Sequence, residues 1–252
     1  MSYPKPSVDR DTNLPGVRSL QHLIIAALIT VGLYFVPYLS FLTYPIRLLV
    51  TFIHEGSHAL AAILTGGHVA SLVIRPDGSG VTWSSGGIGI VTSSAGYLGA
   101  TLFGALLIAA LRRGVPGRHL LLGTGTIVAL LTLCFARASN LDTLANLPLT
   151  IGAGAVIGGG LIFAGLKMPE RSAVFAASFI GVQCILNALF DLHTLFSLSA
   201  SGVTQSDAGN MQAMTMIPAV VWSVLWIAVA AFLLWRVVLV PAFRDARASA
   251  TG

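Results

Sequence analysis

The sequence predicts an all-α membrane protein of about seven transmembrane helices, with a short β-hairpin at the membrane interface. Of its 252 residues, 55% are hydrophobic and only 9% are charged, whereas a soluble domain carries about 25% charged residues. The hydrophobic residues form runs of about 20, the length at which a helix crosses the hydrocarbon core of a bilayer. The net charge of +5 comes from arginines in the links between these runs, which is typical of membrane topology. These observations favour a lipid bilayer as partner, and not nucleic acid.

A polar N-terminal tail, residues 1–19, precedes the first two predicted helices. Residues 20–42 form the first helix, because the run is apolar and long enough to span a bilayer. A tight link at 43–45 ends in proline, which suits the first turn of a helix. Residues 46–65 then form the second helix, and the glycine pair at 66–67 is typical of a helix end.

The sequence pattern predicts a β-hairpin at residues 67–87. Short runs rich in β-branched residues lie on either side of Pro76, Asp77 and Gly78, and these three residues are typical of a tight turn. An unpaired strand cannot face lipid. We therefore expect the hairpin to lie at the membrane interface or to insert beside the second helix.

The remaining predicted helices continue to residue 240, so that residues 20–240 form a single transmembrane domain. Residues 88–111 form the third helix, and its many small residues favour close packing between helices. The later helices are predicted at 120–136, 147–166, 172–195 and 217–240, with polar loops at 138–146 and 197–214 and a basic C-terminal tail at 241–252.

The distribution of arginine and lysine predicts the orientation of the chain. With the N-terminus outside, the inner face receives Arg47, the basic group at 112–118 and the C-terminal arginines, which satisfies the positive-inside rule. The C-terminus is then cytoplasmic, and we expect the membrane to be a bacterial cell membrane. His54 would lie roughly 12 Å into the second helix from its cytoplasmic end.

The second helix contains an HExxH motif formed by His54, Glu55 and His58. Histidines four residues apart share one face of a helix and can bind one Zn²⁺ ion. Glu55 beside them can act as general base toward a water molecule. Ionisable groups inside a membrane helix cost about 2.5–3.5 kcal/mol each on insertion scales, so a bound metal explains them well. The alternative is that they pair with polar groups of neighbouring helices, as in a proton path.

A catalytic zinc site needs a third protein ligand, and three acidic residues are candidates. Asp191 ends an otherwise apolar helix, where an acid should have a partner. Asp207 follows Ser206 and would be either a ligand or part of a helix N-cap. Asp142 lies in a polar loop and is more typical of a surface or capping residue. Asn187 and His193 are candidates for hydrogen-bonding to the ligands from outside the metal site.

Several stretches of the chain form one pattern. They are His54–Leu60 with its Gly-Ser between the histidines, Thr65–Gly67, Pro76–Gly80, Ser94–Gly99, Phe190–Leu192 and Ser206–Ala208, followed by Pro218, Trp222 and Trp226. Together they resemble the B-like branch of the site-2 protease family of intramembrane zinc metallopeptidases, and the resemblance covers roughly residues 46–230.

The resemblance implies a multi-spanning fold in which His54, His58 and an acidic residue of a later helix hold zinc. It also implies that Glu55 is the base and that the substrate is a membrane protein cut within or next to a membrane-spanning helix. The better-studied members carry the third ligand in a Leu-Asp-Gly motif, whereas Asp142 is followed here by threonine. The matching residues of this branch point instead to Asp191 or Asp207.

Two other functions fit the same composition. One is a catalytically inactive membrane scaffold of the same fold. The other is a small ion-coupled transporter that uses the intramembrane histidines and Asp191. The sequence shows no internal repeat of the kind that many transporters contain, which disfavours the second alternative.

Overall fold

Helix α2 (Ser40–Leu64) lies at the centre of the protein and carries the HExxH motif. The computed structural model describes residues 40–200, 206–241 and 244, and it describes no side chains at 40–42, 187–200 and 238. The predicted N-terminal tail, nearly all of the first predicted helix and most of the C-terminal tail therefore lie outside the described residues. The buried residues of α2 include four with large apolar side chains: Leu48, Leu49, Phe52 and Ile53.

Helix α2 begins earlier than the sequence predicted. The expected link at 43–45 is wrong, because the helix runs through it with Pro45 inside. A proline removes one backbone hydrogen bond but does not end a helix when neighbouring contacts hold the segment. Here the hydroxyl of Tyr44 donates to the carbonyl of Pro76 at 2.9 Å. The other end agrees with the prediction, since Gly66 adopts a φ of 85°.

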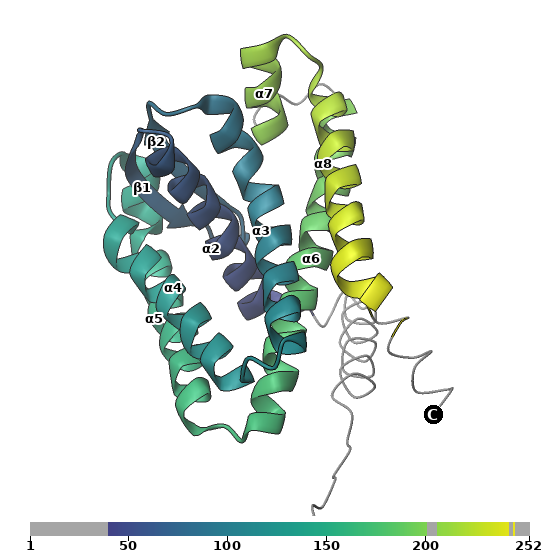
Figure 1. Cartoon of the computed structure of the whole chain (residues 1–252). Helices are drawn as coiled ribbons and strands as arrows, with labels where there is room; N and C mark the ends of the chain where they lie inside the picture. The colour runs from purple at the N-terminus through teal and green to yellow at the C-terminus, as the bar shows by residue number, and fades with distance from the viewer. Residues whose placement is uncertain (1–39, 201–205, 242–243, 245–252) are drawn as a thin grey trace, which may run out of the picture.

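The predicted hairpin is confirmed and packs beside α2 (Figure 1). Strand β1 (His68–Ile74) pairs with strand β2 (Gly80–Ser85) in antiparallel register. The residues from Ser71 to Ile74 are fully buried, whereas the last residues of β2 are exposed. In the turn, the Asp77 carboxylate accepts hydrogen bonds from the amide and hydroxyl of Ser79. The position of the hairpin at a membrane interface stays a prediction.

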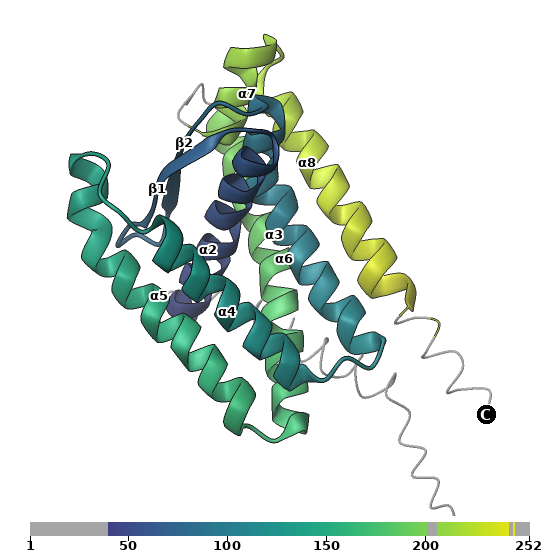
Figure 2. The same ribbon diagram turned by 60° about the vertical axis from the view of Figure 1, so that its left-hand side comes forward.

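In the described part of the chain, six α-helices and a final π-helix follow the hairpin. They are α3 (Gly89–Arg112), α4 (Gly117–Phe135), α5 (Leu141–Lys167), α6 (Glu170–Ala200), α7 (Asp207–Thr215) and α8 (Ala219–Leu233), which continues into η2 (Leu234–Leu239). Figures 1 and 2 show the α4–α5 pair on one side of α2 and the hairpin, and α3, α6 and α8 on the other.

Four helical segments in the described part of the chain are long and apolar enough to cross a membrane: α3, α4, α5 and Ala219–Val237. They correspond to four of the seven predicted spans. Helices α2 and α6 occupy the predicted second and sixth positions. The structure therefore shows a mostly helical protein with four candidate spans and a small sheet, and the count of seven stays a prediction.

Small residues allow the helices to approach closely, as the sequence predicted. A Cβ atom at Gly104 would lie 2.4 Å from the carbonyl oxygen of Gly181, where α3 crosses α6. A Cβ atom at Gly125 would lie 2.7 Å from the carbonyl oxygen of Gly158, where α4 crosses α5. Only glycine permits such contact between backbones. In lipid, where no hydrophobic effect drives helices together, this close packing helps to hold them in contact.

Two predicted loops contain helix starts. Helix α5 begins at Leu141, inside the expected loop at 138–146, because Asn140 accepts a hydrogen bond from the Thr143 amide in a capping box. Helix α7 lies inside the expected loop at 197–214, because Ser206 caps its first turn. Polar N-cap residues accept hydrogen bonds from the free amides at a helix start. Asn140 and Ser206 are typical of loops by composition, but in this structure each one starts a helix.

Candidate metal centre

Three donor atoms meet on one face of α2. Nε2 of His54 lies 3.1 Å from Nε2 of His58, one turn further along the helix. Oδ2 of Asp207 lies 3.3 Å from the first nitrogen and 3.2 Å from the second. The three atoms form a nearly equilateral triangle contributed by two elements that are distant in sequence.

This triangle has the size of a zinc site. In tetrahedral coordination, bonds of about 2.0–2.1 Å hold the donor atoms about 3.3 Å apart. The separations of 3.1, 3.2 and 3.3 Å agree with that value. Two imidazoles and one carboxylate are also a donor set that zinc enzymes use, with a fourth position free for water or substrate. The residues present therefore fit the metal that the motif predicts.

Helix α7 brings Asp207 to the histidines. The hydroxyl of Ser206 accepts from the Gly209 amide at 3.1 Å and starts the helix, so that Asp207 is its first residue. Ala208 and Met211 are fully buried and pack in one cluster with Trp226 of α8. A helix of nine residues is marginal alone, so this packing determines where the Asp207 carboxylate lies.

The imidazole of His58 is oriented from outside the triangle. Its Nδ1 lies 2.6 Å from the carbonyl oxygen of Thr92. A carbonyl can only accept, so Nδ1 carries a proton, and Nε2 is the ring nitrogen turned toward Asp207. Metal-binding histidines are commonly held by such an outer hydrogen bond, which sets the tautomer and the orientation of the ring.

The imidazole of His54 is held by aromatic rings. The ring of Tyr97 meets it edge-on, with centroids 4.7 Å apart and an interplanar angle of 86°. Tyr97 in turn stacks on Trp226 at 5.6 Å, and Trp226 is 1% exposed. Rigid neighbours of this kind limit the rotamers of a ligand side chain.

Helix α3 closes over the histidines only because it has small residues there. A Cβ atom at Gly96 would lie 2.4 Å from Nε2 of both His54 and His58. A Cβ atom at Gly99 would lie 2.3 Å from Oγ of Ser57. Gly96 thus leaves free the space directly in front of the two nitrogen donors.

Glu55 lies on the side of α2 that faces the hairpin. Its side chain is buried, and its Oε2 accepts a hydrogen bond of 2.8 Å from the hydroxyl of Thr82. Glu55 adjoins His54 in the chain, but its carboxylate does not belong to the group of donor atoms formed by His54, His58 and Asp207. Sequence reasoning singled out Glu55 but gave no signal for Thr82, because that contact depends on how the hairpin folds back.

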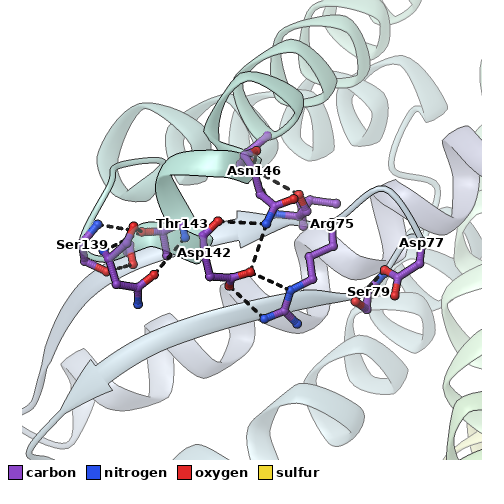
Figure 3. A network of polar contacts seen from close by, with 11 residues as sticks. Arg75, Asp77, Ser79, Ser139, Asp142, Thr143 and Asn146 are labelled. Atoms are coloured by element: carbon purple, nitrogen blue, oxygen red, sulfur yellow. Dashed lines mark hydrogen bonds and ion pairs between the residues drawn. The ribbon is translucent and has the colours of Figure 1, made fainter.

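Asp142 is engaged elsewhere. Its carboxylate accepts from the Arg75 guanidinium at 2.9 and 3.3 Å and from the Asn146 amide at 3.1 Å, as Figure 3 shows. The hydrogen bonds between Arg75 and Asp142 raise the pKa of Arg75 above its ordinary value. Asp142 therefore ties the hairpin to the start of α5 instead of meeting the histidines.

The remaining candidates belong to one helix, α6. Asp191, Asn187 and His193 lie on the backbone of α6, but their side chains are outside the described residues. The predictions that Asp191 binds the metal and that the other two support the ligands stay predictions. Among the described residues, the group of histidine, cysteine, aspartate and glutamate side chains able to hold a metal is His54, His58 and Asp207.

A helical, apolar protein that gathers two histidines of an HExxH helix and a carboxylate belongs to the class of membrane proteins with a metallopeptidase-like centre. Comparison with family models gives the family: the Peptidase M50B-like model matches residues 24–237. The chain therefore belongs to the M50B-like peptidase family, and the resemblance to site-2 proteases is confirmed. No curated protein and no solved structure matched the chain.

Proposed function

We propose that this protein is an intramembrane zinc endopeptidase that hydrolyses peptide bonds within or next to membrane-spanning segments of other proteins. The observation that carries the proposal is the triangle of donor atoms from His54, His58 and Asp207, which has the dimensions of a tetrahedral zinc site. Glu55 lies on the same helix as the two histidines. Membership of a peptidase family supports the same conclusion.

His54, His58 and Asp207 would hold the ion and leave one position open to substrate or water. Zinc bound there would supply Lewis acidity toward the scissile carbonyl and toward a water molecule. The hydrogen bond from Nδ1 of His58 to Thr92 and the packing of Tyr97 on His54 keep both Nε2 atoms turned toward Asp207, where the ion would bind.

Glu55 would act as general base and then as general acid. Its carboxylate takes a proton from the attacking water and later delivers it to the leaving amide nitrogen, which cannot leave as an anion. Burial of Glu55 strengthens these proton transfers, because few competing water molecules reach the carboxylate.

The substrate would approach along the outer edge of β2. In the described part of the chain the sheet has two strands, so this edge is free to pair with an extended peptide by strand addition. An open cavity of about 330 Å³ lies beside it, lined by polar and apolar residues of β2, α3 and α7. These include Ser84, Ser85, Thr92, Ser93 and Asn210.

The membrane setting follows from the exposed apolar side chains. Residues such as Leu106, Leu133, Val156 and Phe163 are more than half exposed on the candidate spans, and lipid is the solvent that tolerates them. We propose that seven spans, a cytoplasmic C-terminus and a bacterial cell membrane complete this arrangement, as the sequence predicted.

The experiment is a comparison of the wild type with Glu55→Gln in cell membranes and after purification. Metal analysis should find about one zinc per chain in both proteins, since Glu55 is not a ligand. Quantitative proteomics of the membranes should find membrane-protein fragments only with the wild type. Equal fragment patterns for the two proteins would show that the protein is not a protease, and ion-linked flux in liposomes would then favour a transporter.

A further inference from the structure

The carboxylate of Glu55 is held by the hairpin. The hydroxyl of Thr82 lies 2.8 Å from Oε2 of Glu55 and 3.0 Å from its backbone carbonyl. A hydroxyl has one proton to donate. The carboxylate oxygen is the closer acceptor and carries charge, and charge-assisted hydrogen bonds are the stronger ones. The proton of Thr82 therefore belongs to Oε2.

Strand β2 lies against Glu55 with no side chain between them. A Cβ atom at Gly80 would lie 2.6 Å from Cγ and 2.9 Å from Oε1 of Glu55, and 2.7 Å from Cγ2 of Thr51. Glycine at this position brings the backbone of β2 into contact with the carboxylate. Gly80 and Thr82, two residues apart on one strand, thus define the wall that Glu55 faces.

The hairpin itself is tied to the helices at both ends of its turn. The hydroxyl of Thr51 donates to the Gly78 carbonyl at 2.7 Å, which joins the turn to α2. The Ile74 amide donates to the hydroxyl of Thr150 at 2.9 Å, which joins β1 to α5. The ion pair of Arg75 with α5 in Figure 3 adds to this. Contacts with α2 and α5 therefore fix the position of the hairpin, and with it the position of Thr82.

We propose that Thr82 is the positioning residue of Glu55, and this inference rests on the proposed protease function. A glutamate side chain has three rotatable bonds, and a hydrogen bond to one carboxylate oxygen selects one rotamer. Thr82 holds Glu55 in the orientation from which it exchanges protons, while the zinc ligands are held separately by α3 and α7. Loss of the hydroxyl should then impair proton transfer without emptying the metal site.

The test uses the purified full-length chain loaded with zinc, in detergent. The probe is a quenched-fluorescent apolar peptide of about 20 residues, the length of a membrane span. Thr82→Val removes the hydroxyl and keeps the shape, and Thr82→Ser restores the hydroxyl. Thr124→Val is the matched control, because the hydroxyl of Thr124 is also buried but donates to the carbonyl of Leu120 in its own helix.

A general base contributes about 10²–10⁴-fold to rate, so Thr82→Val should lower kcat by roughly 10-fold or more with KM unchanged. Thr82→Ser should recover most of the rate, and Thr124→Val should resemble the wild type. All of them should retain zinc. A Thr82→Val protein with the wild-type kcat, or one that has lost zinc, would overturn the proposal.

Melting temperatures test the same contact without any substrate. Thr82→Val should lower the melting temperature in the wild-type background and leave it unchanged in a Glu55→Ala background. An equal loss in both would mean that the hydroxyl serves the backbone carbonyl of Glu55, which contradicts the proposal. If the wild type cleaves no peptide, the protease assignment fails, whereas these melting temperatures still decide whether Thr82 holds Glu55.

Discussion

His54 and Asp207 lie near opposite ends of the described chain, yet Nε2 of the first and Oδ2 of the second are 3.3 Å apart. Helix α2 supplies one and the first turn of α7 supplies the other. The contact closes the donor triangle with His58, and it depends on the docking of a short helix against α3 and α8.

Asp207→Ala should abolish stoichiometric zinc binding. Removing one of three protein ligands leaves two imidazoles, which hold zinc far more weakly than a complete site. Metal analysis of the purified protein measures this directly. Asp142→Ala is the matched control and should keep its zinc, because that carboxylate is bound to Arg75. If Asp207→Ala keeps its zinc and Asp191→Ala loses it, the third ligand is Asp191 of α6 and not Asp207.

Gly96→Ala should weaken zinc binding roughly 10–100-fold, the range seen when the surroundings of metal ligands are disturbed. The added methyl group would lie 2.4 Å from both histidine nitrogens and must displace them or α3. A competition titration with a zinc chelator gives the affinity. Gly123→Ala is a suitable control, since a Cβ atom there meets nothing within 4 Å. Equal affinities for the two variants would contradict the close approach of α3.

Ser206→Ala should destabilise α7 by about 0.5–2 kcal/mol, the usual effect of losing an N-cap. Because Asp207 is the first residue of that helix, its carboxylate should lose its fixed position and zinc affinity should fall. Chelator competition and thermal unfolding together measure both effects. Ser206→Asp restores a capping oxygen and should recover the zinc affinity. If the affinity stays low in Ser206→Asp, zinc binding does not depend on the N-cap.

The hairpin turn should show a pH dependence that comes from Asp77. Hydrogen bonds from the hydroxyl and amide of Ser79 hold the pKa of the Asp77 carboxyl below its ordinary value of 3.8. A depressed pKa stabilises the folded turn fully above the ordinary value, and the contribution is lost as pH falls through the lower folded pKa. Carbon-13 NMR titration of Asp77 gives its midpoint. Ser79→Ala should move this midpoint upward toward 3.8, and an unchanged midpoint would refute the assignment.

Local signals in the sequence predicted the local structure well. The four-residue spacing of His54 and His58 placed both on one helix face, and Gly66 ended that helix. Pro76, Asp77 and Gly78 formed the expected turn of a hairpin. These features depend on periodicity and on the backbone preferences of glycine and proline, which act over a few residues and do not need the rest of the fold.

Helix boundaries were harder to predict where polar residues cap helices. Asn140 and Ser206 resemble loop residues in composition, but both accept the amides of a helix start. The decisive evidence is whether the residues that follow pack against other helices. For α7 the burial of Met211 in a cluster with Trp226 supplies that packing, and no short-range pattern records it.

By itself the sequence determined a membrane protein with an HExxH helix, a hairpin and a need for one more acidic ligand. Only the tertiary structure decided which acids lie where: Arg75 pairs with Asp142, while the docking of α7 carries Asp207 to the histidines. It also placed Thr82 against Glu55. The physical reason is that such contacts join distant segments through packing, and the spacing of residues along a chain does not encode which distant surfaces fit together.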